Sequence, residues 1–121
     1  MAKATTATIV SDATTVDPGE AVLKPNSSTP GQTEVSLPVW EGDGIRAGIW
    51  EVSPGTFKSK RDGYDELCQI LSGSATITEA NGNSFDVAAG SFFVTPAGWE
   101  GSWAVHETLR KVWVIHDAVS D

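Results

Sequence analysis

From Pro38 onward, short runs of β-branched and aromatic residues are interrupted by Gly, Pro or Asn about every 8 to 12 residues. No stretch repeats its apolar residues with the period of a helix. The pattern therefore predicts an all-β sandwich or barrel. Strands are expected over residues 45–52, 64–72, 74–79, 84–87, 91–95, 101–105 and 109–116.

Turn residues separate these expected strands. Asn81-Gly82-Asn83 predicts a tight hairpin, because Asn-Gly accepts the positive φ angles that such a turn requires. Gly73 and Pro96-Ala97-Gly98 mark two further turns.

The first part of the chain has a different composition. Residues 1–37 are rich in Thr, Ser and Pro and contain only short apolar pieces, so they are expected to form an extended N-terminal arm to a barrel over residues 38–121. Two interpretations of the arm remain open. It is either a flexible tail or a strand-bearing segment that packs on its own barrel or on a second subunit.

The strand over residues 64–72 contains the most informative position of the chain. Alternation places Glu66 on the same face as Cys68 and Ile70, whereas Asp65 and Gln69 fall on the polar face. A carboxylate inside a barrel is costly unless it meets a metal, a cation or hydrogen-bond donors. The side chains expected to face the interior are those of Glu66, Cys68, Ile70, Ala75 and Ile77.

Charge and cysteine content narrow the partners. The chain has 8 Lys and Arg against 16 Asp and Glu, a net charge of −8, so neither nucleic acid nor an anionic membrane is an expected partner. The single cysteine, Cys68, excludes an internal disulfide. The first residues lack the apolar core of a secretory signal, and a soluble, cytoplasmic protein is expected.

Several pieces together resemble a known family. Glu66 and Gly73, with six residues between them, resemble the end of the first cupin motif, and residues 90–98 (Gly-Ser-Phe-Phe-Val-Thr-Pro-Ala-Gly) resemble the start of the second. With residues 48–55 upstream and Arg110, Lys111 and Trp113 downstream, the order is similar to that of small cupins related to the ureidoglycine aminohydrolase cupin domain. The resemblance covers about residues 38–117.

The resemblance implies a double-stranded β-helix, or jelly-roll barrel, with a pocket at its mouth and often a divalent metal held by the two motifs. Here the usual first pair of histidines is replaced by residues 59–63, and the second-motif histidine falls on Gly101. Glu66 alone remains as a weak metal candidate, and Asp65 has the outward strand parity. Because transition-metal sites draw on three or four ligands, no metal cofactor is expected.

The candidate ligand-binding residues surround Glu66, which is also the one candidate catalytic residue. Lys60 or Arg61, if turned inward, would take the place of the missing histidines and pair with Glu66 or with an anionic substrate. Otherwise these cations belong to a solvated strand edge. The same choice applies to Arg110 and Lys111.

Aromatic residues complete the candidate set. Trp99 and Trp103 follow the turn at residues 96–98, where they would line the pocket mouth or pack in the core. Tyr64, at the start of the Glu66 strand, is the remaining candidate. His106 and His116 lack the spacing of a ligand pair and are expected on the surface or in hydrogen bonds.

Three functions remain open. The preferred one is a cupin that binds a small polar or anionic metabolite without a complete metal site. The alternatives are a metal-dependent aminohydrolase of ureidoglycine-like substrates, as the resemblance implies, and a non-catalytic dimeric scaffold. Apolar strand surface at residues 39–40, 49–50 and 112–114, together with the resemblance, also predicts a homodimer.

Overall fold

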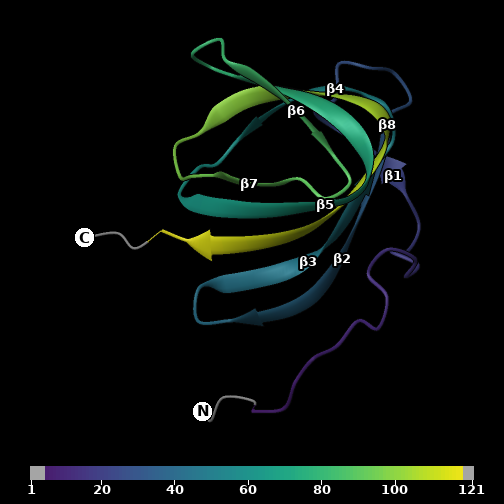
Figure 1. The fold of residues 1–121 in the computed structure, drawn as a ribbon, viewed down its shortest axis with the longest axis vertical. Coiled ribbons are helices and arrows are strands. Elements are labelled where there is room, and N and C mark those ends of the chain that lie inside the picture. Colours follow the sequence, from purple (N-terminus) through teal and green to yellow (C-terminus); the bar gives the residue numbers. More distant parts are fainter. Residues whose placement is uncertain (1–4, 119–121) are drawn as a thin grey trace.

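The computed structural model describes residues 5–118, whose regular structure consists of antiparallel strands (Figure 1). The described part contains no helix that is long and apolar enough to span a membrane. The strands are β1 (Val22–Leu23), β2 (Thr33–Gly42), β3 (Ile45–Val52), β4 (Gly55–Lys60), β5 (Tyr64–Glu79), β6 (Ser84–Ala88), β7 (Phe92–Thr95) and β8 (Glu100–Asp117).

Two long strands, β5 and β8, pair with each other along nearly their whole length, and the two halves of this pair have different neighbours in one eight-stranded sheet. The first half of β5 pairs with β7 and with the second half of β8, which pairs in turn with β3. The second half of β5 pairs with β6 and with the first half of β8, which pairs in turn with β4. The sheet curves around a lumen, as Figure 1 shows, and forms a jelly-roll barrel.

The predicted turn at Gly73 is instead a bend inside β5, so the two strands expected on either side of it are one. Gly73 has a φ of 87°, and a Cβ there would lie 2.0 Å from the carbonyl oxygen of Thr108. Only glycine therefore lets β5 approach β8 this closely. The two strands expected over residues 101–105 and 109–116 are likewise joined, as β8.

Inward side chains are even-numbered before the bend and odd-numbered after it, because the pairing register of β5 with β8 shifts between Ile70 and Ala75. The expected inward set is confirmed, since all five of its members are buried. They are Glu66, Cys68, Ile70, Ala75 and Ile77.

Three strands were not predicted from the sequence. β1 is two residues long, and β4 shows little alternation because its inward positions include Gly55 and Ser59 beside the single apolar residue Phe57. β2 contains Pro38, and its register with β3 shifts between Pro38 and Trp40. Proline is tolerated there because it sits at an irregularity of the ladder.

Much of the arm packs on its own barrel, which the sequence left open. β1 pairs with β2, and the Arg110 guanidinium donates hydrogen bonds to the carbonyls of Ala13 at 3.2 Å and Val16 at 2.7 Å. Further along, the Ser28 amide donates to the carbonyl of Thr56 on β4. β2 begins at Thr33 and continues into the barrel without a break.

The apolar core fills the lumen around the bends of β5 and β8. Its members come from β3, β4, β5, β6 and β8 and are all buried: Val52, Phe57, Ile70, Ala75, Ile77, Val87, Trp103, Val105 and Leu109. Phe57 stacks on Trp103 with ring centroids 5.8 Å apart. Trp103 and Phe57 also form the wall between this core and a cavity in the remaining part of the lumen.

Candidate functional site

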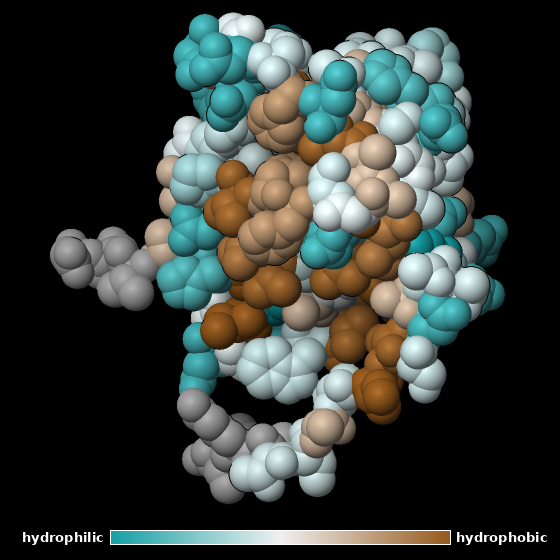
Figure 2. All heavy atoms as spheres, in the orientation of Figure 1, coloured by the Kyte–Doolittle hydropathy of each residue, from teal (hydrophilic) through white to brown (hydrophobic). Residues whose placement is uncertain are grey.

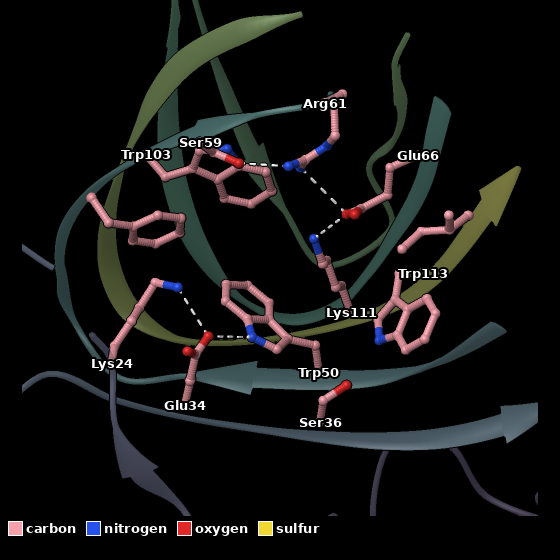
Figure 3. Close-up of a pocket in the computed structure, with 12 residues that line it drawn as sticks. Lys24, Glu34, Ser36, Trp50, Ser59, Arg61, Glu66, Trp103, Lys111 and Trp113 are labelled. Atoms are coloured by element: carbon pink, nitrogen blue, oxygen red, sulfur yellow. Dashed lines mark hydrogen bonds and ion pairs between the residues drawn. The ribbon is translucent and has the colours of Figure 1, made fainter. Parts of the chain in front are cut away.

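A cavity of about 240 Å³ occupies the lumen beyond Trp103 (Figure 3). Its walls combine aromatic rings with five charged side chains. The lining residues are Lys24, Glu34, Ser36, Trp50, Phe57, Ser59, Arg61, Glu66, Trp103, Lys111, Trp113 and Ile115. A volume of this size suits a small metabolite.

Glu66 is the centre of the charged groups. Its Oε2 accepts a hydrogen bond from Lys111 Nζ at 2.5 Å and one from Arg61 at 3.4 Å. The Cys68 thiol donates to the same oxygen at 3.2 Å. Figure 3 shows Arg61 and Lys111 approaching the carboxylate from different directions. Two cations thus meet one carboxylate oxygen inside the barrel.

Strand register brings these groups together. Across the β5–β8 ladder, Glu66 lies opposite Ile115 and Ile70 lies opposite Lys111, so Lys111 shares the inward face with Glu66. Trp50 lies opposite Lys111 on β3 and points inward for the same reason. Arg61 follows directly after β4 and turns into the lumen.

Burial and charge act in opposite directions on the pKa of Glu66. Burial alone would raise this pKa, but the charges of Lys111 and Arg61, with the hydrogen bonds from Lys111 and Cys68, outweigh it and hold the pKa below its usual value. Glu66 is therefore an ionised carboxylate at neutral pH. Burial, together with the charge of Glu66, raises the pKa of the Cys68 thiol to about 12, so Cys68 is not a thiolate nucleophile.

Arg61 is fixed on several sides. Its Nε donates to the hydroxyl of Thr95 at 2.9 Å, and its Nη1 donates to the hydroxyl of Ser59 at 2.5 Å. The guanidinium also lies 5.7 Å from the ring centroid of Trp99 and 6.0 Å from that of Tyr64. These contacts hold the guanidinium in position beside Glu66.

A second ion pair lies on the opposite wall of the cavity. Lys24, from the N-terminal arm, bonds Glu34 of β2 at 2.9 Å, and Trp50 Nε1 donates to the same Glu34 oxygen at 3.0 Å. The Lys24 ammonium lies 4.3 Å from the ring centroid of Phe57. The arm therefore contributes a charged residue to the cavity.

Aromatic rings connect the two ion pairs. The Lys111 ammonium lies 4.6 Å from the ring centroid of Trp50 and 4.7 Å from that of Trp103, which are cation–π distances. Trp50 and Trp103 meet edge to face at 6.1 Å. Among the described residues, Trp103 Nε1 is the one buried side-chain nitrogen or oxygen without a hydrogen-bond partner.

The predicted ligand-binding residues fall into two places. Glu66, Arg61 and Trp103 line the cavity. Lys60 and Tyr64 instead line an open groove of about 790 Å³ on the outside, where the Tyr64 hydroxyl donates to the carbonyl of Lys60. Arg61 borders both spaces, because it turns inward where Lys60 does not.

Trp99 lies beside Arg61, outside the set that lines the cavity. Its indole N–H donates to Glu79 at 2.9 Å. Sequence reasoning left Arg110 and Lys111 either on a solvated strand edge or turned inward. The structure places Lys111 in the cavity, whereas Arg110 lies on the opposite face of β8, buried under the N-terminal arm and bonded to Glu51 at 2.9 Å.

Sequence reasoning missed the second ion pair and assigned no site role to Trp50. No motif marks Lys24 or Glu34, because each reaches the cavity from a segment whose place depends on tertiary packing. A signal existed for Trp50, since period-2 alternation in residues 45–52 groups it with Gly48 and Val52.

The two histidines lie outside the cavity. His116 Nδ1 is 3.1 Å from Asp65, and His106 Nε2 is 2.8 Å from the hydroxyl of Thr76. Both are exposed. The expectation that they are surface or hydrogen-bonded residues is confirmed.

The donor groups around Glu66 do not fit the divalent metal that the family resemblance implies. No group of three or more His, Cys, Asp or Glu able to hold a metal lies within residues 5–118. Two cations already bond Glu66 Oε2, and their positive charges would repel a metal cation at this carboxylate. At Gly101, a Cβ would lie 2.6 Å from ring atoms of Trp99 and 2.5 Å from the carbonyl oxygen of Thr78, so the second-motif position has no room for a ligand.

A jelly-roll barrel with its charged cluster inside the lumen, built around the glutamate of the first motif, defines a cupin. The chain belongs to the EutQ-like cupin domain family, whose model matches residues 39–113. Comparison with curated proteins finds no match.

Solved structures of similar fold carry varied names. The Clostridium difficile EutQ protein has a TM-score of 0.66 and 19% identity, covering 76% of this chain and 68% of its own. A protein of unknown function from Pseudomonas syringae has a TM-score of 0.70 and 22% identity, covering 86% of this chain and 46% of its own. Ectoine synthase from P. lautus has a TM-score of 0.63 and 14% identity, covering 78% and 70%. Likeness at these identities is a likeness of fold, and this chain spans less than half of the Pseudomonas protein.

Proposed function

We propose that this chain binds a small organic anion inside the barrel, at the place where the family resemblance implies a metal. The observation that carries the proposal is the convergence of Arg61 and Lys111 on Glu66 in a cavity open to a ligand. An ammonium has three N–H donors and a guanidinium has five, so both cations can bond a second acceptor while they keep Glu66.

The charge of the cavity supports the same proposal. Three cations, Lys24, Arg61 and Lys111, face two carboxylates, Glu34 and Glu66, and the difference is one positive charge. This positive cavity lies inside a chain whose net charge is −8. A buried excess charge is unfavourable until a counterion neutralises it, so an anionic ligand gains affinity here.

The other two functions have less support. A metal-dependent aminohydrolase of ureidoglycine-like substrates needs a metal, and the groups around Glu66 do not fit one. Glu66, as an ionised carboxylate, suits the role of a base better than that of an acid. A role as scaffold alone leaves the charged cavity without a purpose.

A homodimer remains part of the proposal. Val94, Leu67, Val114 and Ala47 lie in one row across β7, β5, β8 and β3, on the sheet face opposite Glu66. Figure 2 shows hydrophobic residues gathered over the centre of one face of the molecule. A twofold contact would cover such a surface. We propose a cytoplasmic setting, where the single cysteine stays reduced.

The test of anion binding uses calorimetry and thermal unfolding at low salt with benzoate as the probe. Benzoate should bind and raise the melting temperature by linkage. Lys111→Met removes the ammonium at similar volume and should abolish the effect, while the exposed Lys58→Met serves as the matched control and should keep it. Binding that survives in a folded Lys111→Met variant would place the anion elsewhere and contradict the proposal.

A further inference from the structure

The two carboxylate oxygens of Glu66 have different surroundings. All three donors that reach this carboxylate, from Lys111, Arg61 and Cys68, bond Oε2, and no residue in the described part of the chain donates to Oε1. The side chain is only 9% exposed, yet Oε1 is not sealed off, because the one sealed and unpaired side-chain nitrogen or oxygen of the described residues is Trp103 Nε1. Glu66 Oε1 is therefore an acceptor that a molecule in the cavity can reach.

An acceptor of this kind calls for a donor. Despite burial, the charges of Lys111 and Arg61 hold the pKa of Glu66 below its usual value, so both of its oxygens carry negative charge at neutral pH. A charged oxygen in a site with aromatic walls is unfavourable unless it accepts a hydrogen bond. A ligand that enters the cavity displaces water there, so the ligand must supply this donor itself.

Unused donors belong to the same cluster. The Lys111 ammonium has three N–H groups and bonds Glu66 and, at 3.7 Å, the Cys68 sulfur, which leaves one. Arg61 Nη2 has two N–H groups and bonds Glu66 with one of them. Figure 3 shows both cationic groups beside this carboxylate, and both side chains line the cavity. One end of the ligand therefore has to accept from two cations and donate to Glu66 Oε1.

This combination selects among organic anions. A plain carboxylate accepts from the cations, but it brings a second negative charge toward Glu66 Oε1 and no donor. An α-amino acid has a donor, but its ammonium adds a positive charge beside Lys111 and Arg61, and its zwitterion leaves the excess of one positive charge in the cavity. A carboxylate with a hydroxyl group on the adjacent carbon accepts with one group, donates with the other and neutralises the excess.

We propose that the ligand is a small 2-hydroxycarboxylate. Its carboxylate accepts hydrogen bonds from Lys111 and Arg61, and its hydroxyl donates to Glu66 Oε1. Its remaining carbon atoms pack against the indole of Trp50, which lines the same cavity. Glu66 is then a binding residue that recognises the hydroxyl, besides forming ion pairs. The inference rests on the proposed anion-binding function and names the ligand class for that site.

The first experiment is calorimetry on the unmodified chain with three probes of the same shape. Mandelate carries the 2-hydroxyl, phenylacetate lacks it, and phenylglycine has an ammonium in its place. The tighter enantiomer of mandelate should bind roughly tenfold or more tightly than either of the other two, because it alone adds a charge-assisted hydrogen bond without adding a positive charge.

The second experiment removes the acceptor with Glu66→Gln. Lys111 and Arg61 require an acceptor, so they hold the amide oxygen of the glutamine, and its NH₂ group takes the place of Oε1. The preference for mandelate over phenylacetate should fall to about threefold or less, although both anions gain from the additional positive charge. Glu51→Gln is the matched control and should keep the preference, because Glu51 bonds Arg110 on the other face of the sheet.

A third measurement needs no variant. The ¹³C signal of the Glu66 side-chain carboxylate should move on addition of mandelate and much less on addition of phenylacetate, because only the hydroxyl brings a donor to Oε1. The signal of the Glu51 carboxylate should stay in place with both probes.

The outcomes separate this inference from the proposed function. If mandelate and phenylacetate bind with equal affinity and Lys111→Met abolishes both, the hydroxyl assignment is wrong and anion binding stands. If phenylglycine binds most tightly, the ligand is an α-amino acid and the inference is again wrong. If neither benzoate nor any of the three probes binds at millimolar concentration, both proposals fail.

Discussion

The two ends of the barrel lumen are built from the same strands and have opposite chemistry. On β5, Ile70 and Ile77 belong to the apolar core, whereas Glu66 lies in the charged cavity. On β8, Leu109 is a core residue and Lys111, two positions later, is a buried cation. The inward face of each of these strands therefore packs in the apolar core along one part of its length and lines the charged cavity along another.

The apolar end contributes more to the stability of the fold than the charged end does. Burial of apolar surface contributes about 25 cal/mol per Å², and the core around Ile77 contains no ionised group. At the charged end, desolvation of Glu66, Arg61 and Lys111 offsets much of their mutual attraction. The charged end therefore adds less stability than its contacts suggest, which favours a binding role for it.

The largest expected effect comes from breaking the bend that joins the two ends. Gly73→Ala adds a Cβ 2.0 Å from the Thr108 carbonyl at a φ of 87°. We expect the free energy of unfolding to fall by roughly 4 kcal/mol, measured by urea denaturation. Gly82→Ala is the control, because Gly82 has a similar φ and no atom within 4 Å of the added Cβ, and it should cost about 1 kcal/mol. Equal losses for the two variants would show that the close approach is unimportant.

Next in size is a cavity made in the apolar end. Ile77→Ala should lower the free energy of unfolding by about 3 kcal/mol, because Ile77 is fully buried in the core. Benzoate affinity in the folded variant should stay within about twofold of the original, since Ile77 does not line the cavity. A large loss of benzoate affinity would mean that the two ends are coupled, and would contradict their separate roles in stability and binding.

Removing a cation from the charged end should cost less. Lys111→Met should lower the free energy of unfolding by about 2 kcal/mol, because Glu66 keeps Arg61 and the Cys68 thiol as partners. Its effect on anion binding should be far larger than that of Ile77→Ala. Chemical denaturation measures the stability of the Lys111→Met and Ile77→Ala variants, and calorimetry on the same samples measures their anion binding. A larger loss of stability for Lys111→Met than for Ile77→Ala would show that the ion cluster is mainly structural.

The smallest effect concerns pH. The folded pKa of Glu66 lies below the value of 4.5 for the free group, so at this residue the unfolded chain binds more protons than the folded chain. The stabilisation is therefore complete above pH 4.5 and is lost as the pH falls through the folded pKa. Glu66→Gln should flatten the loss of stability as the pH falls below about 4.5, because the variant has no carboxyl to protonate at this position. Parallel curves for the two chains in urea unfolding series would show that other carboxylates govern acid unfolding.

Sequence periodicity alone determined the all-β class, the bounds of β3 and the inward face of β5. These features are local, since alternation reports which side of a strand is buried without reference to its partner. The glutamate Glu66 was recognised for the same reason, because a carboxylate on an apolar face stands out in the sequence.

Tertiary structure alone decided how the charges meet. Arg61 rather than Lys60 turns inward, and Lys111 rather than Arg110, because pairing register and the bend at Gly73 set which residue of each adjacent pair faces the lumen. Lys24 reaches the cavity from an arm whose path depends on distant contacts. Strand periodicity assigns faces, but contacts between residues far apart in the chain follow from register and bulges, which a single sequence does not encode locally.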